Sequence, residues 1–170
     1  MIAVRAVAAD DADRLRAFFA RVPEGDRTFF REDVLAPGVV EQWSADRHAR
    51  RLVAVDDGAV VGYGAVLPGI AWSSHVGEIR LVVSPDHRRR GLGRRLADAA
   101  VGEATGLGLT KLVVEVVAEQ EATVAMFSAM GFEGEGLLRD HVRSQAGEMH
   151  DLLLLSRVVG GAGTAGGRGG

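Results

Sequence analysis

The chain has 170 residues, of which 47% are hydrophobic and 25% charged, and its formal net charge is −3. These values are typical of one globular domain, and the acidic balance excludes a protein that binds polyanions over its whole surface. The lack of cysteine excludes disulfides, cysteine–zinc sites and thiol catalysis. The start, MIAVRAVAADDADRL, has no basic signal-peptide region, and no apolar run approaches the roughly 18 residues of a membrane span. We therefore expect a cytoplasmic protein that binds no membrane.

The first part of the chain predicts a strand followed by helices. Residues 2–7 read as a strand, and apolar residues recur at helical spacing over residues 11–22. Asp10 or Asp11 stands at the start of this run and can cap the helix. Residues 39–50 predict a second helix before the rest of the sheet begins.

The remainder of the chain predicts strands mixed with helices. An Asp57-Gly58 pair within residues 51–69 predicts a hairpin of two strands. The segments expected after it are a strand at 75–84, a helix at 91–106, a strand at 110–117, a helix at 121–130 closed by Gly131, and an antiparallel pair at 132–142 and 149–159. This order predicts a mixed α/β (α+β) sheet in one domain, residues 1–159. The glycine-rich stretch 160–170 cannot bury enough surface to order itself, so we expect it to be disordered.

An arginine-rich loop with two glycines lies between a predicted strand and a predicted helix. Its arginines fall within residues 88–95, around Gly91 and Gly93. Free N–H groups and the helix dipole make a helix start an anion site, and glycine allows a ligand to approach the backbone closely. A pyrophosphate is therefore a natural ligand. Neither the P-loop pattern nor the GxGxxG fingerprint fits this loop.

A third pattern does fit the loop and its neighbours. Arg88-Arg89-Arg90-Gly91-Leu92-Gly93 matches [Q/R]-x-x-G-x-[G/A], directly after the strand end Leu81-Val82-Val83-Ser84-Pro85. A later helix ends at Gly131-Phe132. Together these segments resemble the acetyl-CoA loop and its surroundings in the GNAT superfamily of N-acetyltransferases. The resemblance extends over residues 2–158, nearly the whole chain.

The resemblance implies a fold and a cofactor. The fold is an open, mostly antiparallel mixed sheet whose fourth and fifth strands splay apart, with helices on its faces. The cofactor is acetyl-CoA, which acts as co-substrate, and no metal is implied. The implied contacts are the backbone of Leu81, Val82 and Val83 for the pantetheine arm, and the backbone amides of Arg88, Arg89, Arg90, Gly91, Leu92, Gly93 and Arg94 for the pyrophosphate.

Transfer to an amine requires a base, because an alkylamine with a pKa of about 10.4 is mostly protonated at neutral pH. The apolar residues of the strand at 75–84 alternate onto one face, which leaves Glu78 and Arg80 on the other. Glu78 stands where many GNAT enzymes place their catalytic glutamate, so we expect it to be the base. The alternative is that Glu78 only pairs with Arg80 or stays solvated.

Four other groups could take part in the chemistry. Glu115 interrupts an apolar strand and is a second candidate base. His75 and His87 titrate in a suitable range but lie at strand ends, where we expect surface histidines. The backbone N–H of Val83 is expected to polarise the thioester carbonyl as an oxyanion hole does.

Two positions depart from the family pattern. Phe127 stands where many members carry a tyrosine acid, and Gln120 stands where they carry an asparagine. We expect both to contact the cofactor, with Phe127 beside the pantetheine arm. Since Phe127 cannot donate a proton, either water protonates the thiolate or the thiolate leaves unassisted, as a thiol with a pKa of about 8.5 can do. A missing tyrosine combined with a glutamate in the fourth strand is also similar to bacterial protein-lysine acetyltransferases.

The acceptor of the acetyl group is less defined. The resemblance implies that residues 23–50 and 137–150 line its site, and acids within 24–46 could attract a cationic amine on a protein lysine, a peptide N-terminus or a small molecule. We expect Trp43 and Trp72 in the core, with a cleft wall as the alternative. An exposed edge strand could support a homodimer.

Two rival functions belong to other classes. Because Phe127 and Gln120 replace common family residues, the chain could be a non-catalytic acyl-CoA-binding sensor, which would bind acetyl-CoA and never release thiol. A nucleic-acid module is disfavoured by the acidic net charge and by an aromatic content of 5%. We therefore expect no nucleic-acid partner.

Overall fold

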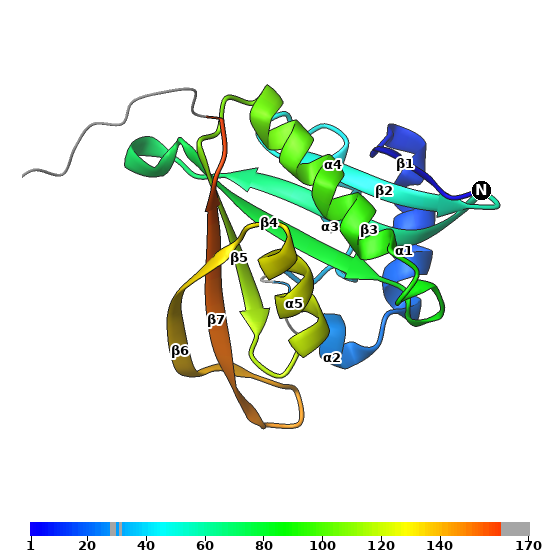
Figure 1. The fold of residues 1–170 in the computed structure, drawn as a ribbon. Coiled ribbons are helices and arrows are strands. Elements are labelled where there is room, and N and C mark those ends of the chain that lie inside the picture. Colours follow the sequence, from blue (N-terminus) through cyan, green and yellow to red (C-terminus); the bar gives the residue numbers. More distant parts are fainter. Residues whose placement is uncertain (28–29, 31, 161–170) are drawn as a thin grey trace, which may run out of the picture.

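A seven-stranded sheet with the strand order β1-β2-β3-β4-β5-β7-β6 runs through the molecule (Figure 1). The computed structural model describes residues 1–27, 30 and 32–160. The strands are β1 (Ala3–Ala6), β2 (Arg50–Asp56), β3 (Ala59–Pro68), β4 (Val76–Val83), β5 (Lys111–Val117), β6 (Glu133–Arg143) and β7 (Met149–Val158). Neighbouring strands are antiparallel except β4 and β5, which are parallel. The expected mixed, mostly antiparallel sheet is confirmed.

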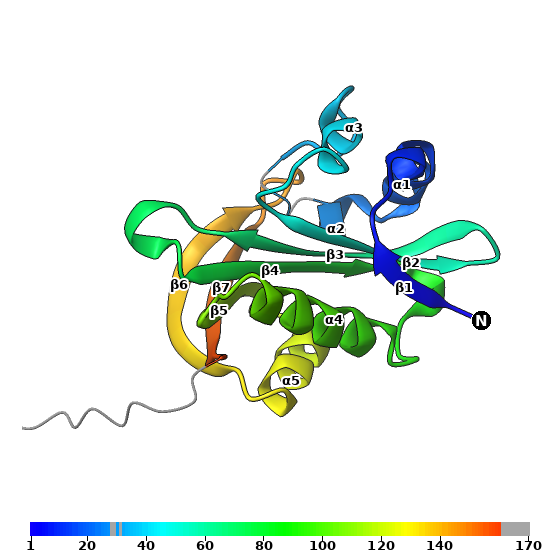
Figure 2. The ribbon, with the colours of Figure 1, turned by 90° about the horizontal axis from the view of Figure 1, so that it is seen from above.

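Helices cover both faces of this sheet. Figure 2 shows α1, α2 and α3 on one face and α4 and α5 on the other. The helices are α1 (Ala12–Arg21), α2 (Glu24–Arg27), α3 (Val39–Trp43), α4 (Leu92–Gly106) and α5 (Glu121–Ala129). The helix expected at 39–50 is shorter than predicted, because Asp46 accepts the backbone N–H of His48 at 2.9 Å and turns the chain away.

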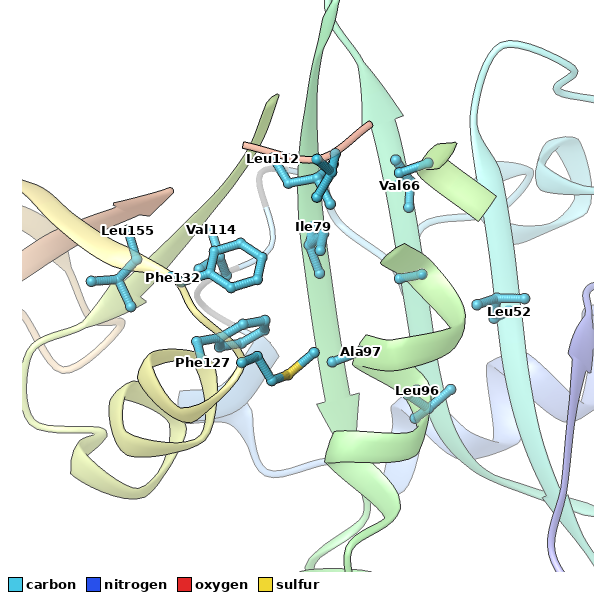
Figure 3. Close-up of a cluster of buried hydrophobic side chains, with 14 of the residues drawn as sticks. Leu52, Val66, Ile79, Leu96, Ala97, Leu112, Val114, Phe127, Phe132 and Leu155 are labelled. Atoms are coloured by element: carbon cyan, nitrogen blue, oxygen red, sulfur yellow. The ribbon is translucent and has the colours of Figure 1, made fainter. Parts of the chain in front are cut away.

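The face under α4 and α5 holds the larger core. Alternate residues of the central strands meet the apolar stripe of α4, and α5 adds an aromatic contact (Figure 3). The helix α4 packs closely on β3, since a Cβ atom at Gly62 would lie 2.8 Å from a methyl group of Leu96. Residues of this core include Leu52, Val66, Ile79, Leu96, Ala97, Leu112, Val114, Phe127, Phe132 and Leu155.

The opposite face is held by an aromatic cluster. Trp43 stacks on Tyr63 with ring centroids 4.8 Å apart, and Phe19 meets both rings edge-on. Burial raises the pKa of Tyr63 above its ordinary range. The core prediction is therefore confirmed for Trp43. It is wrong for Trp72, which is 93% exposed in the 3₁₀ turn Ala71–Ser73 between β3 and β4.

Other expectations from the sequence can be compared directly. The Asp57-Gly58 turn has φ angles of 46° and 79°, and it joins β2 to β3 as the hairpin signal predicted. Residues 161–170 of the glycine-rich stretch lie outside the described residues, so their disorder stays a prediction. In the described part of the chain, no helix has the length and apolar character that a bilayer span requires.

Asp11 ties the first strand to the first helix. It is fully buried, and its carboxylate accepts hydrogen bonds from the Arg5 guanidinium at 2.6 and 2.8 Å and from Arg14 at 3.1 Å. It also accepts the backbone N–H of Ala8 at 2.8 Å, so it caps the preceding 3₁₀ turn instead of α1. These donors, Arg5 first, hold the pKa of Asp11 well below its usual range.

We expect Asp11→Asn to lower the free energy of unfolding by about 2 kcal/mol at neutral pH, because charged hydrogen bonds to a buried carboxylate are lost. A lowered native pKa stabilises the fold above the unfolded pKa, so the wild-type chain should lose this contribution as the pH falls below about 4. Urea unfolding across pH measures both effects. Asp13→Asn, whose side chain is 87% exposed, is the control and should change little. Equal stability of D11N and wild type would contradict the assignment.

Candidate active site

The site begins where two parallel strands separate. The pairing of β4 with β5 runs from Val76 and Lys111 to Ile79 and Val114 and then stops. Beyond that point β4 stays paired with β3, and β5 stays paired with β7. Each strand therefore follows its own half of the twisted sheet, and a cleft of about 730 Å³ opens beside the end of β4.

The backbone at the end of β4 faces this cleft. The Ser84 N–H donates to Val61 of β3 at 2.9 Å, so the N–H of the preceding residue, Val83, points to the other side, toward β5. The carbonyl of Val83 points the same way and accepts a hydrogen bond from Arg88 Nε at 3.0 Å. The splay thus leaves a strand edge with backbone donors available to a ligand.

The loop after β4 brings a helix start to the same cleft. Arg89 and Gly91 have φ angles of 59° and 76°, which turn the chain so that α4 begins at Leu92. The first intrahelical bond comes from Arg95 N–H, so the N–H groups of residues 92–94 have no helical acceptor within the described chain. These donors, the dipole of a 15-residue helix and the neighbouring arginines suit a phosphate group.

Most of the residues predicted to bind the cofactor lie on the cleft. They are Leu81, Val82, Val83, Arg88, Arg89, Gly91, Gly93, Arg94 and Gln120. Two others lie elsewhere among the described residues: the side chain of Leu92 is in the core, and Arg90 does not line the cleft. The side chain of Leu92 points inward because it begins the apolar stripe of α4.

Phe127, which was expected beside the pantetheine arm, does not line the cleft. Its ring is fully buried and meets the ring of Phe132 edge-on, with centroids 5.1 Å apart (Figure 3). The cleft-facing side of α5 carries Thr123 and Met126 instead. Helical spacing alone could have indicated that Phe127 and Met126 point in different directions, because neighbouring residues of a helix point about 100° apart.

The two candidate bases lie on the opposite face of the sheet from α4. Glu78 accepts a hydrogen bond from Arg80 Nε at 3.2 Å, and its side chain is 24% exposed. Arg80 also faces Glu32 at 3.8 Å and lines the cleft, whereas Glu78 lies one pleat back from it. Glu115 is two residues beyond Val113, the partner of Glu78 on β5, and so shares this face.

A second cavity of about 600 Å³ lies on this face, beside α2. Its lining combines carboxylates with apolar side chains and one residue of the β6–β7 hairpin: Glu24, Arg27, Phe30, Glu32, Asp33, Val34, Leu35 and Gln145. Its lining therefore includes residues from both segments expected to surround the acceptor, 23–50 and 137–150. His75 and His87 line neither cavity, and His87 bonds the hydroxyl of Ser84 at 2.8 Å.

The sequence analysis did not predict several residues that line the cleft. Asp26, Glu119, Glu121, Thr123 and Met126 all line it. The helical pattern of α5 could have indicated the last three. The residues around Asp26 in the sequence do not indicate its position on the cleft, because its partner Arg88 is 62 residues away.

Comparison with known proteins gives consistent results. Residues 12–132 match the family described as the acetyltransferase (GNAT) family. The ribosomal protein bS18-alanine N-acetyltransferase of Salmonella typhimurium is 30% identical over 74 residues, 44% of this chain and 50% of that protein. The N-alpha-acetyltransferase RimI of Mycobacterium tuberculosis is 26% identical over 156 residues, 89% of this chain and 90% of that protein. The chain thus spans half the length of the first of these relatives.

A solved structure extends the similarity to the fold. The acetyltransferase yncA of Salmonella typhimurium, solved with its cofactor acetyl-CoA, superposes with a TM-score of 0.79 and 16% identity, over 96% of each chain. At this identity the similarity concerns the fold alone.

We expect Phe127→Tyr to lower the free energy of unfolding by about 1–3 kcal/mol, because the new hydroxyl is buried against Phe132 without a partner. Urea unfolding measures the change. Ser128→Ala, at the exposed neighbouring position, is the control and should stay within about 0.5 kcal/mol of wild type. If F127Y is as stable as wild type, the edge of this ring reaches the cleft after all.

Proposed function

Because the chain belongs to the acetyltransferase (GNAT) family, we propose that it transfers an acetyl group from acetyl-CoA to a primary amine, by direct transfer in a ternary complex. The observation that carries this proposal is the cleft between the splayed β4 and β5, which ends at the start of α4. Free backbone N–H groups and arginines there suit a pyrophosphate, and the strand edge of β4 suits the amides of a pantetheine arm.

The proposed chemistry uses two groups of β4, the carboxylate of Glu78 and the backbone N–H of Val83. Glu78 takes one proton from the protonated amine, and the neutral nitrogen then attacks the thioester carbon. The Val83 N–H, which points toward β5, stabilises the oxyanion. The nitrogen gives its second proton to water as the carbon–sulfur bond breaks and the amide forms. The thiolate leaves without an acid from α5 or takes a proton from water, since Phe127 is buried away from the cleft.

The second cavity is the proposed place of the acceptor. Its carboxylates, Glu24, Glu32 and Asp33, favour a cationic amine, and it lies on the face that carries Glu78. One relative is named as a ribosomal protein bS18-alanine N-acetyltransferase and another as an N-alpha-acetyltransferase, so a protein or peptide N-terminus is the first acceptor to test, before lysine and small amines. The proposal keeps the cytoplasm as the location expected from the sequence.

A non-catalytic acyl-CoA sensor remains the second candidate. The observation that favours it is the absence of a hydroxyl at Phe127, together with the pairing of Glu78 to Arg80. A sensor would bind acetyl-CoA and release no thiol in the presence of any amine. An acceptor screen with thiol detection separates the two functions.

We expect wild-type protein to bind acetyl-CoA with micromolar affinity in calorimetric titrations and Arg89→Gln to weaken binding about tenfold, because a charged contact to phosphate is lost. Arg90→Gln is the matched control, since it removes the same charge from the adjacent residue, which does not line the cleft. Equal losses in both variants would contradict the loop geometry. No binding by the wild type at millimolar acetyl-CoA would end the proposed function.

We expect Glu78→Gln to reduce kcat about 100-fold at pH 7, with acetyl-CoA affinity unchanged, because the amine keeps its proton. Turnover of E78Q should partly recover as the pH rises toward the pKa of the amine. Thiol release across pH measures both effects. Glu115→Gln tests the second candidate: a large loss there, with E78Q near wild type, would transfer the role of base to Glu115.

A further inference from the structure

The short helix α2 separates the two cavities. Asp26 lines the cleft assigned to the cofactor, whereas Glu24 and Arg27 line the second cavity, and Phe30 lines both. An acceptor nitrogen in the second cavity has to reach a thioester in the cleft. The position of α2 therefore affects whether an acceptor in the second cavity can reach the cleft.

An ion pair between Arg88 and Asp26 joins α2 to the loop after β4. Arg88 Nη2 donates a hydrogen bond to Asp26 Oδ2, and Arg88 Nε donates to the Val83 carbonyl at 3.0 Å. The guanidinium is thus held between α2 and the end of β4. Both partners of the ion pair are partly exposed, at 42% for Arg88 and 24% for Asp26, so the pair can exchange for another anion.

The other carboxylates near the cleft are arranged differently. Glu119 pairs with His150 at 3.2 Å, and Glu121 lies in the first turn of α5. Arg94 pairs with Asp98, which does not line the cleft. Among the described residues that line the cleft, Asp26 is therefore the carboxylate that holds an arginine of the phosphate-binding loop.

We propose that Asp26 is a positioning residue that competes with the cofactor phosphates for Arg88, so that cofactor binding releases α2 and couples the cleft to the acceptor cavity. This inference rests on the proposed function. A phosphate carries more negative charge than a carboxylate and accepts the same forked donors, so it replaces Asp26 at the guanidinium. Once displaced, Asp26 would lie beside an anion, and the resulting repulsion favours movement of α2 away from the loop.

The helix α2 is short, and its contacts to the rest of the fold include polar ones: besides the Asp26–Arg88 pair, Arg27 Nη1 donates a hydrogen bond to the Phe19 carbonyl of α1 at 3.2 Å. It has four residues, and none of them is buried. Its internal support is weak, because the N–H groups of Asp26 and Arg27 both donate to the Pro23 carbonyl, at 2.9 and 3.2 Å. A segment with few buried contacts opens locally without unfolding the rest of the chain.

Calorimetric titration with acetyl-CoA tests the competition. We expect Asp26→Asn to bind about three- to fivefold more tightly than wild type, because no carboxylate has to be displaced from Arg88. Glu121→Gln is the matched control: it removes the same charge from the cleft without freeing Arg88, and it should have a smaller effect. In an Arg88→Gln background, D26N should lose its advantage. Unchanged or weaker binding by D26N, or an equal gain in E121Q, would overturn the competition.

Hydrogen exchange of the wild-type protein tests the coupling. On saturation with acetyl-CoA, the backbone N–H groups of residues 24–27 should exchange several-fold faster, while those of α1 stay unchanged. Unchanged or slower exchange in α2 would overturn the coupling. If wild-type protein binds no acetyl-CoA at all, the proposed function fails and the inference fails with it. Binding without an effect of D26N rejects the inference alone.

Discussion

The end of the pairing between β4 and β5 is the constraint on which the site depends. Up to Ile79 and Val114 the two strands complete each other's hydrogen bonds, and beyond that point β3 holds β4 while β7 holds β5. The twist of each half-sheet carries the strands apart. The inner edge of β4 then presents backbone donors and acceptors that need partners. A ligand with amide groups satisfies them without disturbing the outer pairs.

Packing on the larger core places the start of α4 beside the cleft. The helix α4 lies close to β3 because Gly62 leaves room for Leu96, and the positive φ of Gly91 lets the helix begin directly beside the cleft. A tightly packed helix keeps its free N–H groups in one place, so an anion meets donors that are already oriented. The same packing draws Phe127 inward, which removes the usual position of a proton donor from the cleft.

The two cavities differ in their balance of charge. Four arginines and three carboxylates line the cleft, whereas one arginine and three carboxylates line the second cavity. Arg80 stands at the boundary, because it lines the cleft and faces both Glu78 and Glu32. Under the proposed function, this difference favours the phosphates of the acetyl donor in the cleft and the amine of the acceptor in the second cavity.

The sequence by itself determined the order of the elements, the Asp57-Gly58 hairpin and the position of the arginine–glycine loop, because glycine, proline and alternating apolar residues act on their immediate neighbours. It also placed Glu78 on the sheet face away from α4. The tertiary structure alone decided that Trp72 is exposed and Phe127 is buried, and that Asp26 holds Arg88. These outcomes depend on which distant segments pack together. Local sequence patterns do not indicate a contact between side chains that are 62 residues apart.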